Sequence, residues 1–307
     1  GLELILVQTY GVHLSSQDAW GIAGRDVAVI FACPTGDEIG LLGAPGGARA
    51  ALRVAQARRL REPAVVAAGV AMLEAKLANQ ASTLRYLARA PGRRASLAGA
   101  ELGRAADGIR EIAGRLSLAG ASPAPPEELA PRLMGHEGQA AALYWAALGR
   151  LVPEELGFPG RRTRRATDPV NQSLNYLYGI LYGELWRALA RTGLDPGMGI
   201  LHRAPRSPGG LVYDLIEELR APLADRLLVT LLGRGFRPAT GLGPAASHLT
   251  LRSSRILSRA FASQRKRVLR RGRARVLAGE LPGLQAAALR SLLLGETDSY
   301  PAFHFRW

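Results

Sequence analysis

The spacing of apolar and polar residues divides the chain into two parts. The first part shows short β-rich runs bounded by turn residues, at 2–9, 27–34 and 38–45, with a short helical stretch at 15–24. From residue 47 onwards, apolar residues recur at the period of an amphipathic helix. The pattern therefore predicts an α+β fold that is mostly α, with an N-terminal β-rich domain over 1–46 and an α-helical domain over 47–307.

The second part is expected to be entirely helical. Pro and Gly residues mark the boundaries of its predicted helices, which cover 48–63, 62–90, 95–120, 131–153, 171–194, 211–236, 253–277 and 281–296. Pro222 predicts a kink or break inside one of them. Three strands are few for a free-standing β domain. The N-terminal domain is therefore expected to be incomplete, with strands missing before Gly1 or supplied by a partner.

The charge of the chain favours a polyanionic partner. Its formal net charge is +15 and its pI is about 11, and Lys76 and Lys266 are the only lysines, so nearly all basic residues are arginines. The arginine guanidinium group is a planar fork that matches phosphate groups. Nucleic acid is the commonest partner of such a chain. An anionic membrane surface is the alternative, but no basic amphipathic anchor stands out.

Cysteine content and hydropathy exclude several other classes. Cys33 is the only cysteine, so a disulfide framework and a multi-cysteine metal site are both excluded. No apolar run approaches the length of about 18 residues that a transmembrane helix needs, and the first residues lack the basic region of a signal peptide. We therefore expect a cytoplasmic protein without membrane contact.

Two acidic residues, Asp214 and Glu217, stand three apart in a predicted helix and so project from one face. Carboxylates held this close repel each other unless a cation or a proton lies between them. The flanking residues are apolar, and acidic groups on an apolar helix need a partner. The alternative is a solvated helix face on which Glu217 simply pairs with Arg220.

Two further polar residues have suggestive surroundings. His202 follows a Gly-rich turn, and Glu137 sits among alanines in the helix predicted at 131–153. The plain alternatives are a surface or capping histidine and an exposed glutamate in a first helical turn. Taken with Glu217, these side chains form a ligand set that suits Mn²⁺ or Mg²⁺ without excluding Zn²⁺. A metal ion held in this way polarises a phosphoryl oxygen and activates a hydroxyl group or a water molecule.

Six segments together resemble a known family, the CRISPR-associated integrases of spacer acquisition, here called the Cas-one family. In chain order they are ALRVAQARRL, AKLANQASTLR, HEGQAAALYW, DPVNQSLNYLYGILYGEL, GLDPGMGILH and LVYDLIEELRAPLADR. The last four are the most specific, because several rare residues recur in the family's order. The N-terminal unit resembles only the later part of the family's β domain, and the basic C-terminal stretch matches in character rather than by motif.

The resemblance implies a catalytic helical domain with a metal site of Glu137, His202 and Glu217, which takes Mg²⁺ or Mn²⁺, and a supporting acid at Asp214. It implies an endonuclease and integrase that inserts short double-stranded DNA into a CRISPR array when each 3′-hydroxyl attacks a repeat phosphodiester. The implied partners are double-stranded DNA, a second copy of the chain and the small Cas-two protein. Some family members are joined to a reverse transcriptase or a nuclease, so this chain could derive from a fusion.

Two arginine-rich stretches are the expected DNA contacts. One precedes the helix at 171–194 and the other lies in the basic helix predicted at 253–277. We expect them to contact the phosphate backbone rather than to read bases, with a solvated charged loop as the alternative for the first. The residues are Arg161, Arg162, Arg164, Arg165, Arg265, Lys266, Arg267, Arg270 and Arg271. Asn171 is expected to support the site by hydrogen bonds or to be a buried structural amide, and Arg220 is expected to orient Glu217.

Two other functions remain open at this stage. A transposon-encoded integrase would use the same site, although such proteins usually carry a further DNA-binding domain after the core. A non-catalytic nucleic-acid-binding scaffold would be favoured if Glu137, His202 or Glu217 were missing. All three are present.

Overall fold

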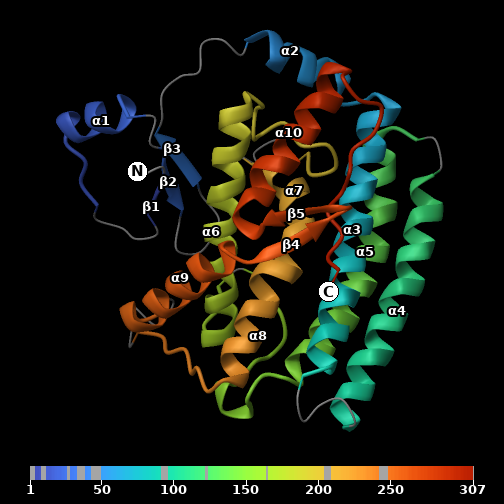
Figure 1. Ribbon diagram of the computed structural model, residues 1–307, viewed down its shortest axis with the longest axis vertical. Coiled ribbons are helices and arrows are strands. Elements are labelled where there is room, and N and C mark those ends of the chain that lie inside the picture. The colour runs from blue at the N-terminus through green and yellow to red at the C-terminus, as the bar shows by residue number, and fades with distance from the viewer. Residues whose placement is uncertain are drawn as a thin grey trace.

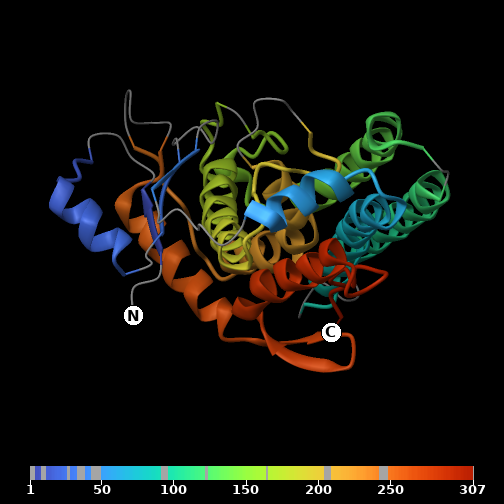
Figure 2. The same ribbon diagram turned by 90° about the horizontal axis from the view of Figure 1, so that it is seen from above.

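The computed structural model describes residues 4–7, 12–25, 28–32, 39–42, 50–90, 96–121, 124–163, 165–203, 209–241 and 248–306. Cys33, Arg164 and the predicted domain boundary at residue 46 lie outside this part of the chain. Two regions are visible, a small sheet at one side and a larger group of helices beside it (Figures 1 and 2).

The N-terminal region is a three-stranded mixed sheet in the order β1 (Leu4–Val7), β2 (Ala28–Ala32), β3 (Ile39–Leu42). β1 and β2 are parallel, and β2 and β3 are antiparallel. Parallel neighbours need a crossover connection, and α1 (Ser16–Ala23) lies in it. A capping box between Ser15 and Asp18 starts this helix. The sheet contacts α6 of the helical region.

The rest of the described chain is mainly helical, which confirms the mostly-α fold. Its helices are α2 (Ala50–Arg59), α3 (Pro63–Ala88), α4 (Leu97–Gly120), α5 (Pro126–Gly149), α6 (Pro169–Thr192), α7 (Gly210–Arg220), α8 (Arg226–Gly233), α9 (Leu251–Arg265) and α10 (Leu281–Leu294). Their ends follow local signals in the sequence. At the start of α6, for example, Asp168 accepts a hydrogen bond from the N–H of Asn171, and Gly193 ends that helix with φ 85°.

Helix α3 is central to the helical region. It packs against α4, α5 and α7, and its buried face belongs to one continuous apolar core. Among its polar residues, Asn79 donates to the carbonyl groups of Glu218 (2.6 Å) and Phe303 (2.8 Å) and accepts from the N–H of Phe305. One amide side chain thus ties α7 and the C-terminal segment to α3.

Pro222 does not break the helix that carries it. Residues Ala221–Asp225 (η3) form a π-helical turn between α7 and α8, so the three segments make one continuous rod. Proline cannot donate the usual backbone hydrogen bond and its ring crowds the preceding turn. A π-turn, which adds one residue to a helical turn, relieves that crowding.

The prediction of one basic helix over 253–277 is wrong beyond Arg265. After α9 the chain forms a hairpin of β4 (Val268–Arg271) and β5 (Ala274–Leu277). Gly272 has φ 61° and opens a two-residue loop, a position that favours glycine. A helix would have placed arginines on every face, whereas the hairpin leaves Arg270 and Arg275 exposed and half-buries Leu269 against the core.

Within the described residues, no helix combines the length and the apolar character needed to cross a membrane.

Candidate active site

Two of the predicted acidic residues come together around a lysine. Glu137 lies in the middle of α5 and Glu217 lies on α7, 80 residues later in the sequence. The Nζ atom of Lys76, on α3, lies 2.5 Å from Glu137 Oε1 and 2.7 Å from Glu217 Oε2. The side chains of Lys76 and Glu217 are only 11% and 5% exposed. Helices α5 and α7 therefore each direct one carboxylate at the lysine on α3.

Glu217 has a second cationic partner. Arg220, one helical turn further along α7, places Nη1 2.8 Å from Glu217 Oε1. Burial alone would raise the pKa of Glu217, but Arg220 and Lys76 outweigh it and lower the pKa to about 2. Burial alone would also lower the pKa of Lys76, but Glu217 and Glu137 raise it above its ordinary value. The cluster is thus held in its charged form on both sides.

Asp214 organises the loop that carries His202. Its carboxylate accepts the N–H groups of Ile200 (2.5 Å) and His202 (3.1 Å) and lies 2.7 Å from His202 Nδ1. Gly199 and Gly210 allow this close approach of the loop to α7, because a Cβ atom on either would collide with the carbonyl oxygen of His202. The imidazole is therefore oriented through Nδ1.

The surroundings of His202 raise the pKa of its imidazole. Burial alone would lower the pKa of the imidazole, but the hydrogen bond and charge of Asp214 raise it, and the charges of Glu217 and Glu137 act in the same direction. Both glutamates are thus close enough to act electrostatically on the ring. The imidazole is hydrogen-bonded to Asp214 and lies within the electrostatic influence of both glutamates, and its role as a ligand stays a prediction.

The neighbouring acid, Glu218, has a structural task. It accepts hydrogen bonds from the hydroxyl of Tyr300 (2.5 Å), the N–H of Phe303 (2.5 Å) and the side chain of Gln285. Burial raises its pKa to about 7 despite these donors. Adjacent glutamates therefore serve opposite sides of α7: Glu217 faces the charged cluster and Glu218 anchors the C-terminal segment.

A ring of tyrosine and arginine side chains borders the cluster. The Cζ atoms of Arg220 and Arg161 lie 4.9 Å and 5.1 Å from the ring centre of Tyr178. Asn171 accepts from Arg161 Nη1 (3.0 Å) and from the N–H of Arg162 (2.9 Å). Asn171 therefore holds Arg161 and Arg162, and among the described residues no hydrogen bond joins it to the carboxylates of Glu137 or Glu217.

Asp225 contacts the same group of tyrosine side chains. Its two carboxylate oxygens accept the hydroxyl groups of Tyr144 (2.9 Å) and Tyr178 (2.5 Å). Burial raises its pKa to about 6, against the hydrogen bonds from both tyrosines and the positive charge of Arg161. The residue lies beside the cluster without joining it.

The predicted metal ligands fit a divalent cation in donor chemistry. Glu137 and Glu217 offer oxygens to one point, and His202, with Nδ1 engaged, keeps Nε2 available. In the described part of the chain, however, no three His, Cys, Asp or Glu side chains are assembled closely enough to hold an ion. The ammonium group of Lys76 stands between the two carboxylates. A metal ion would have to share this position with Lys76 or displace it.

The predicted DNA-binding residues differ in their solvent exposure and in whether their side chains already contact other residues of the protein. In the first stretch Arg162 and Arg165 are exposed, whereas Arg161 is engaged with Tyr178 and Asn171. In the second stretch Arg265 pairs with Glu184 (2.9 Å) and Arg271 donates to Gln285 (2.7 Å). The exposed members of the second stretch are Lys266, Arg267 and Arg270.

Lys76 was missed by sequence reasoning. The signal was present, because Lys76 is one of two lysines in an arginine-rich chain and lies on a helix whose other residues are mostly apolar. A buried cation on such a helix needs an acidic partner. The segment AKLANQASTLR therefore identified the helix without revealing the role of its lysine.

Comparison with known proteins places the chain in a family. The family model described as "CRISPR associated protein Cas1", the Cas-one family of the sequence resemblance, matches residues 2–254. A CRISPR-associated endonuclease Cas1 from Rhodospirillum rubrum is 35% identical over 239 residues, which are 75% of this chain and 68% of that protein. The corresponding endonuclease from Korarchaeum cryptofilum is 33% identical over 261 residues, 83% of this chain and 71% of that one.

Solved structures share the fold. A casposase bound to an integration product has a TM-score of 0.77 at 20% identity and covers 99% of this chain and 83% of its own. A Cas1 protein from Thermotoga maritima has a TM-score of 0.72 at 18% identity, with 95% and 86% covered. A complex of Cas6-RT-Cas1 with Cas2 has a TM-score of 0.78 at 19% identity and covers 100% of this chain but 32% of its own. From the family model and the relatives together, the chain belongs to the Cas1 family of CRISPR-associated proteins.

Proposed function

We propose that the protein is a metal-dependent DNA integrase and endonuclease that inserts short duplex DNA into a CRISPR array. Each 3′-hydroxyl of the incoming duplex attacks a phosphodiester of a repeat strand. One phosphodiester bond forms as one breaks, and the proton lost by the attacking hydroxyl balances the proton taken up by the departing 3′-oxygen, so no nucleotide cofactor is needed. Membership of a family whose relatives are named endonucleases supports the proposal.

One observation carries this proposal. Glu137 and Glu217, from helices far apart in sequence, converge on one cationic position close to His202. The cluster holds two acids and two cations, Lys76 and Arg220, and buried ion pairs add little stability over apolar packing. The convergence of two carboxylates from separate helices on one lysine is therefore better explained by chemistry on a charged substrate than by stability.

Glu137, His202 and Glu217 would hold the divalent cation, Mg²⁺ or Mn²⁺. Such an ion polarises a phosphoryl oxygen and lowers the pKa of a bound hydroxyl group or water. Two further residues orient these ligands. Asp214 keeps Nδ1 of His202 engaged, so that Nε2 points away from the loop backbone. Arg220 holds Glu217 in position.

Lys76 has a role of its own in this proposal. An ammonium group has three N–H donors; Lys76 donates one to Glu137 and forms an ion pair with Glu217. The third is available to an oxygen of the phosphodiester under attack. A fixed cation at that point stabilises charge that builds up as the bond to the departing oxygen breaks.

The arginines are proposed to hold DNA by its phosphates. Arg162 and Arg165 are exposed next in sequence to Arg161, and we propose that they contact the strand whose phosphodiester is attacked. Arg161 is stacked against tyrosine and is better placed to position its neighbours. The exposed members of the second stretch, Lys266, Arg267 and Arg270, are proposed to contact phosphates as well. We further propose that the protein acts as a homodimer with Cas2, since a structurally similar chain is part of a complex of Cas6-RT-Cas1 with Cas2.

The test is strand transfer of a labelled duplex into a supercoiled plasmid that carries a repeat, in Mn²⁺ or Mg²⁺, with and without a Cas2 partner. Glu217→Gln should reduce transfer by at least about 100-fold, the usual scale for losing a charged group that stabilises a transition state, while DNA binding persists. His202→Ala should behave alike. Glu111→Gln, which neutralises an exposed glutamate on α4, is the matched control and should transfer normally.

Two results would contradict the proposal. If Glu217→Gln or His202→Ala retained strand transfer, the site would be refuted. If the unmodified protein showed no metal-dependent DNA chemistry with any of several Cas2 partners, a non-catalytic nucleic-acid-binding function would replace it.

A further inference from the structure

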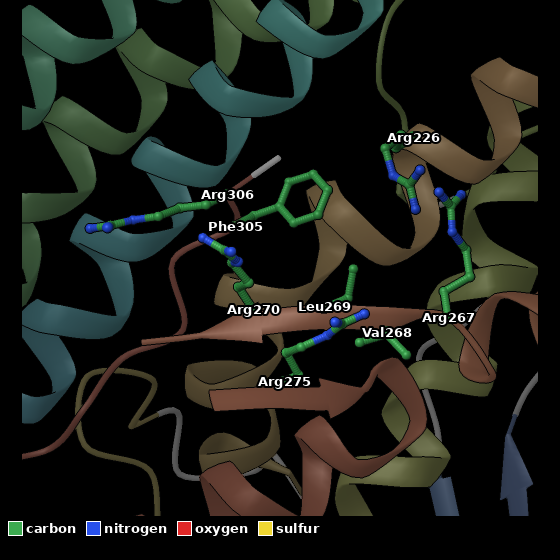
Figure 3. A pocket seen from close by; sticks show the side chains of 8 residues that line it. All are labelled: Arg226, Arg267, Val268, Leu269, Arg270, Arg275, Phe305 and Arg306. Carbon is green, nitrogen blue, oxygen red and sulfur yellow. The ribbon is translucent and has the colours of Figure 1, made fainter. Parts of the chain in front are cut away.

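A pocket lined by arginines lies away from the acidic cluster. Its walls come from α8, the β4–β5 hairpin and the C-terminal segment, and its volume is about 470 Å³. Five of the eight lining residues are arginines, none of the described lining residues is acidic, and Phe305 supplies an aromatic wall (Figure 3). The arginines are Arg226, Arg267, Arg270, Arg275 and Arg306.

Arg226 is the buried arginine that lines this arginine pocket. The residue is 2% exposed, and its guanidinium group lies between the rings of Tyr86 (5.4 Å) and Phe305 (5.5 Å). Nε donates to the carbonyl of Pro222, but Nη2 is buried without a hydrogen-bond partner. A buried charged donor left without a partner is costly. The side chain is held by Pro222 and by a hydrogen bond with Tyr86, and among the described residues Nη2 is the donor left without a partner.

The positive charge of the arginine pocket is not balanced locally. Figure 3 shows the guanidinium groups of Arg226 and Arg267 directed towards each other, and burial followed by the charge of Arg267 lowers the pKa of Arg226. In the described part of the chain, none of the five arginines forms an ion pair with an acid, unlike Arg220 or Arg265 elsewhere. Like charges so close favour an anion between them.

The arginine pocket has a fixed relation to the acidic cluster. Lys76 contacts Glu217, and ten residues further along α3 Tyr86 contacts Arg226, which lies nine residues after Glu217. Helix α3 and the α7–η3–α8 rod therefore run in the same direction from the cluster to the pocket. At about 1.5 Å of rise per residue the offset is about 13 to 15 Å, which corresponds to about four base-pair steps of duplex DNA.

We propose that the arginine pocket binds consecutive phosphates of a nucleic-acid strand, with one phosphate seated on the buried Nη2 of Arg226. A nucleic-acid strand presents one charge about every 3.4 Å, so it can meet Arg226 and the exposed arginines together. The inference rests on the proposed action on DNA and adds to it a phosphate-binding site outside the acidic cluster. An acidic peptide is less well matched, because it would need carboxylates at a similar density.

The test is DNA binding measured by fluorescence anisotropy over a series of salt concentrations, with EDTA present so that metal binding does not contribute. The variant Arg270→Gln with Arg275→Gln removes two exposed guanidinium groups, and Arg226→Met removes the buried one. The matched control, Arg104→Gln with Arg115→Gln, removes two exposed arginines of α4. Both pocket variants should bind at least about 10-fold more weakly, and the double variant should lower the salt slope by about 2.

The outcomes separate this inference from the proposed function. If the unmodified protein carries out strand transfer but the pocket variants bind DNA like the α4 control, the arginine pocket is not a phosphate site and the proposed function stands. If Glu217→Gln abolishes transfer while its DNA binding still depends on Arg270 and Arg275, both are supported. Displacement of DNA by polyglutamate or by a nucleoside triphosphate at equal charge concentration would identify an acidic peptide or a free nucleotide as the occupant and overturn the inference.

Discussion

Among the described residues of the helical region, Lys76 and Arg226 are buried cations, and they differ in whether an acid balances them. At the acidic cluster, Lys76 and Arg220 lie 2.7 Å and 2.8 Å from the carboxylate of Glu217. At the arginine pocket, Arg226 is equally buried but faces Arg267. Both places lie on the same helical rod, so their difference comes from the side chains that surround them.

The acid nearest to Arg226 in sequence illustrates this difference. Asp225 is directed to the hydroxyl groups of Tyr144 and Tyr178, and its raised pKa reflects burial without a strong cationic partner. Asp225 therefore directly precedes Arg226 in the sequence, but its carboxylate is hydrogen-bonded to the two tyrosines instead of pairing with Arg226. In the balanced cluster every buried cation already has an acidic partner, whereas at the arginine pocket the described part of the chain supplies none.

The largest expected effect comes from removing the cation of the balanced cluster. Lys76→Met removes the cation between the half-buried carboxylate of Glu137 and the buried carboxylate of Glu217, and breaking a buried ion pair costs about 3 to 5 kcal/mol of the free energy of unfolding. Mn²⁺ should restore more stability to this variant than it adds to the unmodified protein, because a metal ion replaces the missing charge. Urea unfolding with EDTA and with Mn²⁺ measures both quantities.

The chain offers a close control for that experiment. Lys266 is the only other lysine and is exposed, so Lys266→Met should change the free energy of unfolding by no more than about 0.5 kcal/mol. An equal gain from Mn²⁺ in Lys76→Met and in the unmodified protein would show that the ammonium group and a metal ion do not compete for one position.

The next effect tests Asp225, the acid that does not compensate Arg226. Its folded pKa of about 6 lies above the ordinary 3.8, so the folded protein keeps a proton that the unfolded chain releases. Its contribution to the free energy of unfolding is therefore lost as the pH rises from about 4 to above 6, by about 3 kcal/mol. Asp225→Asn does not titrate, so its stability relative to the unmodified protein should improve by that amount over this range.

Urea unfolding of the two proteins from acid to neutral pH checks this. A constant difference in the free energy of unfolding across the range would mean that Asp225 has the same pKa in the folded and unfolded states. It would then be ionised at neutral pH and contribute negative charge next to Arg226.

The smallest expected effect concerns the loop of the balanced cluster. Asp214→Asn keeps the shape of the side chain but removes the charge that accepts the N–H groups of Ile200 and His202. Hydrogen bonds to a charged group contribute about 1.5 to 3 kcal/mol, so we expect a loss of about 2 kcal/mol and faster hydrogen exchange at residues 200–202. Unchanged exchange there would indicate that glycine packing, rather than Asp214, holds the loop.

The sequence predicted most helices because their signals are local. Apolar spacing, the Asp168 cap and the Gly193 terminator define α6 without reference to the rest of the molecule. The hairpin was missed for the opposite reason. Its density of arginines dominated the pattern, although Gly272 between Val268 and Val276 was a turn signal of the kind that two-residue hairpins use.

The candidate site was predictable only in part. Glu137, His202 and Glu217 were identified through the motifs that contain them, and the Glu217–Arg220 pair followed from helical spacing. The convergence of Lys76 on both glutamates depends on the packing of α3 against α5 and α7, which no local pattern contains. The same holds for Arg226, whose neighbours come from α3 and the C-terminal segment.

The π-helical turn at Pro222 keeps α7 and α8 continuous, so the distance between Glu217 and Arg226 is fixed by the helix. Glu217 and Arg226 are joined by unbroken helix, so no loop movement can change the length between them. Removing the extra residue of the turn would swing Arg226 about 100° around the helix axis and out of its seat between Tyr86 and Phe305. A nucleic-acid strand that contacts both residues therefore meets a spacing fixed by helix geometry. A single inserted or deleted residue between Glu217 and Arg226 would change that spacing.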